Sequence, residues 1–132
     1  MSRSKYFCVM ALALVAALVC SIPVYAQEKI IKIGALYPMT GRAGLYGLDS
    51  VDAAEMAIEE INSKGGVNGY KLELTNTDSK AKPDYSVMVA KRYITQDKTH
   101  FLFGVVSSAV GLALTEVSKQ YKKIFIGTDH AS

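Results

Sequence analysis

Cysteine, histidine and tryptophan are scarce in this sequence of 132 residues, which has two cysteines, two histidines and no tryptophan. Both cysteines, Cys8 and Cys20, lie in an apolar N-terminal run. If that run is removed, the remaining chain has no thiol to attack a substrate, bind a metal or form a disulfide. The two histidines, His100 and His130, do not by themselves complete a metal site. We therefore expect no metal ion and no thiol chemistry.

Phosphate-binding glycine motifs are also missing. No G-x-x-x-x-G-K-[ST] occurs, and Gly41, Gly44 and Gly47 do not fit the G-x-G-x-x-G spacing of dinucleotide-binding loops. The pair Asp129–His130 suggests acid–base chemistry, but no nucleophile or orienting group can be assigned to it. We predict no catalytic residue and no cofactor, and expect that the protein is not an enzyme.

The sequence has no strong excess of charge of one sign. The formal net charge is +3, and removal of residues 1–26 would take away Arg3 and Lys5 but no acidic residue, which leaves about +1. Nucleic-acid binding calls for a clustered basic face. The pairs Lys91–Arg92 and Lys122–Lys123 are interpreted as solvated surface, so nucleic acid is not an expected partner.

The N-terminus has the three parts of a secretory signal. Arg3 and Lys5 precede an apolar run over residues 6–20, and Val24 and Ala26 provide small residues where a signal peptidase cuts. We predict a signal peptide over residues 1–26. The protein is therefore expected to be periplasmic or secreted, with no stable membrane insertion after cleavage.

Two other uses of this segment remain open. A retained membrane anchor needs about 20 apolar residues, whereas the uninterrupted run is shorter and Pro23 breaks its far end. A lipidated Cys20 is disfavoured because Val19, rather than a smaller residue, precedes it. Cleavage is the favoured interpretation.

Strand-like and helix-like segments alternate after the signal. Runs typical of strands lie at 30–36, 70–76, 100–106 and 124–126, and the second of them alternates apolar residues with Lys71 and Glu73. Apolar residues at helical spacing cover about 50–63, 83–94 and 109–121. This order predicts an α/β fold, an open parallel sheet with helices on both faces. The other three strand-like runs are nearly continuous in apolar residues, which is typical of strands buried on both sides.

Capping residues mark the predicted helix ends. Asp49 or Ser50 is expected to cap the first helix, and Gly65–Gly66 to end it. Pro83 fits the first position of the second helix. Ser107 and Ser108 are natural caps for the third.

Ligands of open parallel sheets bind beyond the carboxyl ends of the strands. The segments expected there are 37–47, 106–108 and 127–132. Ser107 and Ser108 offer hydroxyls beside the unpaired amides of a helix start, a combination that binds carboxylate or phosphate without a basic residue. The alternative is that both serines only cap the helix. Tyr46 can wall a pocket, although packing is the commoner use of such a residue.

Several motifs follow one another in a fairly specific order. A strand is followed by Pro38–Gly41 (P-x-T-G), Tyr46–Gly47, a helix, Ile61–Gly66 (I-N-x-K-G-G) and Phe103–Ser108. This order resembles the branched-chain amino-acid-binding proteins, type I periplasmic receptors similar to Leu/Ile/Val-binding protein. The resemblance covers residues 30–132.

The resemblance implies two α/β lobes that close on a ligand held between them. Residues 27–132 correspond to the N-terminal part of the first lobe, and the second lobe is absent from this chain. The implied function is that of the extracytoplasmic substrate-binding component of an ABC transporter, which delivers an amino acid or similar small carboxylate to a permease. A ligand-binding ectodomain of a membrane-anchored sensor or receptor is the alternative.

The same resemblance assigns ligand-binding residues. Ser108 falls on the carboxylate-binding serine, with Ser107 its neighbour, and Tyr46 falls on the tyrosine of the first loop. Asp129 and Ser132 bound the loop that supplies a backbone carbonyl and a hydroxyl to the ligand. Asp129 departs from the small residues usual there, which allows a ligand other than a branched-chain amino acid.

Overall fold

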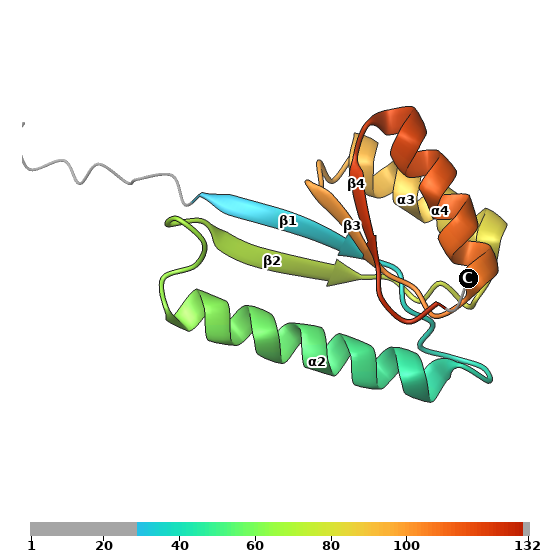
Figure 1. Ribbon diagram of the computed structural model, residues 1–132, viewed down its shortest axis with the longest axis horizontal. Coiled ribbons are helices and arrows are strands. Elements are labelled where there is room, and N and C mark those ends of the chain that lie inside the picture. The colour runs from blue at the N-terminus through green and yellow to red at the C-terminus, as the bar shows by residue number, and fades with distance from the viewer. Residues whose placement is uncertain (1–28, 131–132) are drawn as a thin grey trace, which may run out of the picture.

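A computed structural model describes residues 29–130, so the predicted signal peptide and Ser132 lie outside the described residues. Strands and helices alternate along these residues, as predicted (Figure 1). The elements are β1 Ile30–Ala35, α2 Gly44–Ser63, β2 Lys71–Asn76, α3 Pro83–Thr95, β3 Phe101–Gly104, α4 Ser108–Tyr121 and β4 Ile124–Gly127.

The strands form one parallel sheet in the order β2-β1-β3-β4. β1 pairs with β2 from Ile30 opposite Lys71 to Ala35 opposite Asn76, and its second half also pairs with β3. The chain therefore places β2 on one side of β1 and then places β3 and β4 on the other side. The point of reversal, between β1 and β3, is where open parallel sheets bind their ligands.

Helices lie on both faces of the sheet, as predicted. Figure 1 shows α2 running along one face beside β2, with α3 and α4 on the opposite side. Successive side chains of a strand point to opposite faces. Accordingly, Leu36 and Leu102 join the core formed with α3 and α4, whereas Ala35 packs with Val51 of α2.

The first helix begins at Gly44 and not near residue 50. Its N-cap is Ala43, without a side-chain cap, so the prediction that Asp49 or Ser50 caps this helix is wrong. Glycine explains the earlier start, because a Cβ at Gly47 would lie 1.7 Å from the carbonyl oxygen of Pro38. The first turn of α2 can therefore pack directly against the segment that leaves β1.

The predicted end of α2 and the predicted start of α3 are confirmed. Gly66 has a φ of +79° and donates its amide to the Ile61 carbonyl at 2.9 Å just beyond the end of α2. This left-handed geometry is the usual role of glycine after a helix. Pro83 begins α3, as its fixed φ favours.

The third strand ends sooner than the predicted run over residues 100–106. Gly104 and Val105 have φ values of +100° and +80°, which turn the chain out of the sheet. A positive φ is uncommon for a β-branched residue, so Val105 is a strained position held by its surroundings. His100 precedes the strand and is exposed, with Nδ1 accepting the Lys32 amide at 3.0 Å. Its predicted place inside an apolar strand is wrong.

Strand β4 is not buried on both faces in the described part of the chain. Ile124 and Ile126 are 58% and 48% exposed, since α2 covers the opposite half of the sheet. The apolar run was therefore a correct indicator of a strand but a wrong indicator of its burial. Among the helices within residues 29–130, none is long and apolar enough to cross a membrane.

Tyr93 ties α3 to the sheet and gives a test of the fold. Its hydroxyl lies 2.7 Å from Thr77 Oγ1 and 3.1 Å from the Thr75 carbonyl, and burial raises the pKa of the phenol. Tyr93→Phe should lower the free energy of unfolding by about 1–2 kcal/mol, because it leaves buried acceptors without their donor. Urea denaturation would measure this change. The control Tyr46→Phe alters a side chain that is 69% exposed, and equal losses in the two variants would contradict the prediction.

Candidate functional site

Three segments meet beyond the carboxyl ends of β1, β3 and β4, as the topology predicts. Leu36, just after β1, donates its amide to the Phe103 carbonyl at 3.2 Å. Asp129, after β4, donates its amide to the Val105 carbonyl at 3.3 Å. The loop after β4 is thus held against the strained turn that leads into α4.

Ser107 and Ser108 stand at the start of α4. Ser107 is the N-cap residue by position, but no side-chain hydrogen bond caps the helix. The interpretation that both serines serve only as caps is therefore wrong. Ser107 accepts the amide of Gly111 at 2.9 Å through its carbonyl, and the first amides of α4 have no acceptor within the helix. Both serines are partly buried. Their hydroxyls belong to the same helix start as these unpaired amides.

Ser50 brings two predicted site residues together. Its Oγ lies 2.6 Å from Asp129 Oδ2 and 2.7 Å from the carbonyl oxygen of Tyr46. Tyr46 lies in the first turn of α2 and not in a loop, with its ring exposed to solvent. Sequence reasoning missed Ser50, which was interpreted as a helix cap. The available signal was its spacing of one helical turn after Tyr46.

Tyr37 forms a second link to the loop after β4. Its hydroxyl lies 2.7 Å from Thr128 Oγ1, and its ring fills the space beside Gly104, where a Cβ would come within 2.7 Å. Burial raises the pKa of the Tyr37 phenol, the negative charge of Asp129 raises it further, and the Thr128 hydrogen bond opposes both. The neutral phenol thus joins the ends of β1, β3 and β4. Nothing in the sequence pattern distinguished it from a core residue.

His130 is placed by packing. Its ring stacks on Phe125 at a centroid distance of 6.3 Å and lies beside Gly111 and Gly127. A Cβ at Gly127 would be 1.9 Å from the ring, so these glycines provide the space that the histidine occupies. Within residues 29–130, no group of three or more His, Cys, Asp or Glu side chains is placed to hold a metal.

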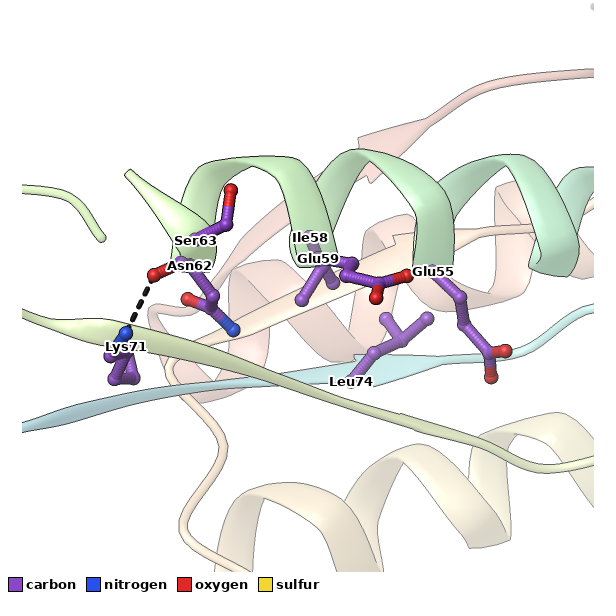
Figure 2. A pocket seen from close by; sticks show the side chains of 7 residues that line it. All are labelled: Glu55, Ile58, Glu59, Asn62, Ser63, Lys71 and Leu74. Atoms are coloured by element: carbon purple, nitrogen blue, oxygen red, sulfur yellow. Dashed lines mark hydrogen bonds between the residues drawn. The ribbon is translucent and has the colours of Figure 1, made fainter. Parts of the chain in front are cut away.

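A groove of about 620 Å³ lies elsewhere, between the later turns of α2 and strand β2 (Figure 2). Asn62 spans it, donating to the Leu72 carbonyl and accepting the Leu72 amide, both at 2.8 Å. Lys71 Nζ donates to the Asn62 carbonyl at 2.6 Å. These contacts fix the helix to the edge strand, which gives the I-N-x-K-G-G motif a structural role. None of the predicted ligand-binding residues lines this groove.

Residues 30–132 match the sequence profile of the periplasmic binding protein family. The chain belongs to this family. Leu/Ile/Val-binding protein homolog 7 from Brucella suis is 37% identical over 109 residues, which are 83% of this chain and 26% of that protein. This periplasmic binding protein chain thus spans about a quarter of the length of the curated relatives it matches. The resemblance noted in the sequence is confirmed.

Solved structures support the same fold. The substrate-binding protein LivJ from Streptococcus pneumoniae, in complex with isoleucine, superposes with a TM-score of 0.74 at 26% identity over 79% of this chain and 30% of that one. A solute-binding protein from Rhodopseudomonas palustris, in complex with 3,4-dihydroxybenzoic acid, gives a TM-score of 0.70 at 28% identity over 80% of this chain and 28% of that one. The predicted type I periplasmic-binding-protein fold is confirmed.

Asp78 holds the first segment of the site in shape. Its Oδ1 accepts the amides of Met39 and Lys80 at 2.8 and 2.9 Å, and Oδ2 accepts the Thr40 hydroxyl at 2.7 Å. Burial raises the pKa of Asp78, but these hydrogen bonds and the nearby Lys80 charge lower it by more, so the net pKa lies below its ordinary value of 3.8. The ionised form is therefore the one that the fold stabilises.

The lowered pKa of Asp78 predicts a pH dependence of stability. Its contribution should be complete above pH 3.8 and should be lost as pH falls through the lower folded-state pKa. Asp78→Asn should therefore reduce the free energy of unfolding at neutral pH and make it fall less steeply below pH 3.8. Urea denaturation at a series of pH values would measure both effects. Identical pH profiles for the two proteins would contradict this prediction.

Proposed function

We propose that this chain is the first part of the first lobe of an extracytoplasmic substrate-binding component of an ABC transporter. The ligand is a branched-chain or other amino acid, or a similar small carboxylate. The observation that carries the proposal is the serine pair at the start of α4, whose hydroxyls do not cap the helix and which stands where parallel sheets bind ligands.

The start of α4 suits a carboxylate. The amides of its first turn and the positive end of its dipole favour an anion, and the hydroxyls of Ser107 and Ser108 add donors. The ligands in two solved relatives, isoleucine and 3,4-dihydroxybenzoic acid, share only the carboxylate as an ionic group. The proposed site also includes Tyr46, which is exposed, Asp129 after β4, and Ser132, which lies outside the described residues.

The proposal assigns to residues 27–132 one side of a ligand cleft. A second lobe would close over the ligand, and the loaded protein would deliver it to a membrane permease. Enclosure gives such sites most of their buried ligand surface, so this part alone should bind weakly. It provides recognition and no catalysis, in keeping with the solute-binding character of its relatives.

Residues 1–26 are proposed to be a cleaved signal that exports the protein to the periplasm. The second candidate, a membrane-anchored sensor ectodomain, is favoured by the apolar run over residues 6–20 if it is retained. Sequencing the N-terminus of protein recovered from a Gram-negative host should give a chain that starts at Gln27. A membrane-bound product that starts at Met1 would instead support the sensor.

The carboxylate site can be tested in a complete cleft. Residues 30–132 would replace the matching segment of the Brucella suis relative, and calorimetry would measure isoleucine binding to this chimaera. Ser108→Ala should weaken binding by about 1.5–3 kcal/mol, the cost of removing a hydrogen bond to a charged group. Ser63→Ala is the matched control, because within residues 29–130 its hydroxyl bonds only to the Glu60 carbonyl, at the far end of α2. Equal affinities for the unmodified and Ser108→Ala chimaeras would remove Ser108 from the site.

A further inference from the structure

Asp129 introduces a negative charge beside a site that is proposed to receive a negative ligand. Its amide is bonded to the Val105 carbonyl, which places the residue against the turn that leads to Ser107. Its side chain is exposed, and its backbone stands beside the turn that leads into α4. A ligand with only a carboxylate would meet this charge as a repulsion, whereas a ligand that also carries an ammonium group would meet it as a partner.

The Asp129 carboxylate has a defined position. Ser50 Oγ, anchored in α2, contacts Oδ2 at 2.6 Å. The neighbouring Thr128 is held by the Tyr37 hydroxyl at 2.7 Å, so the loop is fixed from two sides. Oδ1 has no hydrogen-bond partner within residues 29–130. A carboxylate held through one oxygen can receive a cation with little loss of conformational freedom.

We propose that Asp129 determines specificity in this site and that Ser50 is its positioning residue. Together they select carboxylates that also carry an amino group over carboxylates that do not. This inference rests on the function proposed above and narrows its ligand class to amino acids. It sets this chain apart from a site that takes 3,4-dihydroxybenzoic acid, which has no ammonium group and is the ligand in one solved relative.

The test compares two probes that differ only in the amino group, isoleucine and 3-methylpentanoate. The isotope-labelled full chain would be titrated with each at millimolar concentration, and the amide signals of residues 107–110 and 128–130 would be followed by NMR. Calorimetry on the chimaera would give the dissociation constants. If the full chain alone gives no spectrum of a folded protein, the chimaera provides the same comparison.

Isoleucine should bind at least about tenfold more tightly than 3-methylpentanoate. Asp129→Asn should reduce this ratio roughly 10- to 100-fold, because it removes a charged acceptor for the ammonium group. Ser50→Ala should reduce it by about threefold while leaving 3-methylpentanoate binding unchanged, a split that general destabilisation does not produce. Glu116→Gln removes a charge from the exposed side of α4, and Ser63→Ala removes a hydroxyl from α2. Both controls should keep the original ratio.

The outcomes separate this inference from the proposed function. If neither probe binds the chimaera, the proposed function fails and the inference fails with it. If both probes bind equally well, or if Asp129→Asn leaves their ratio unchanged, the carboxylate site stands and the role of Asp129 is overturned. If Ser50→Ala weakens both probes equally, Ser50 supports only the fold and loses its positioning role.

Discussion

Strand β1 is hydrogen-bonded to a parallel neighbour on each side, and this pairing fixes where the other elements can lie. Parallel neighbours require crossovers, which take α2 over one face and α3 over the other. The carboxyl ends of the strands then open at one edge, with a gap where the crossovers diverge. All the candidate ligand contacts within the described residues stand at that edge. The location of the candidate site therefore follows from the strand order. The side chains at this edge determine which ligand it can take.

Much of this arrangement could be predicted from the sequence because the strands and helices are encoded locally. Apolar runs of strand length alternate with helical spacing, and glycine and proline mark two of the ends at Gly65–Gly66 and Pro83. The start of α2 could not be predicted in this way. It depends on how closely Gly47 can approach Pro38, a contact between segments that the periodicity of neither one reveals. The burial of β4 likewise depends on which half of the sheet α2 covers.

The candidate site also contains residues that could be predicted from local sequence and residues that could not. Ser107 and Ser108 could be identified because a strand end followed by a helix start is a local pattern. Ser50 and Tyr37 could not, because their importance comes from partners far along the chain, Asp129 and Thr128. Only the folded structure brings these pairs within hydrogen-bond distance. A single sequence shows which residues have suitable chemistry, while their neighbours decide which of them are held in place.

The ring of His130 occupies a space that two other positions leave empty. It lies beside Gly111 in α4 and Gly127 at the end of β4, where an added Cβ would come within 3.1 Å and 1.9 Å of the ring. We therefore expect the residues at these three positions to vary together. Among relatives that share this backbone, a bulky residue at either glycine position should be accompanied by a small one in place of the histidine. A larger side chain at Gly127 would therefore require the imidazole to move or to be replaced by a smaller group.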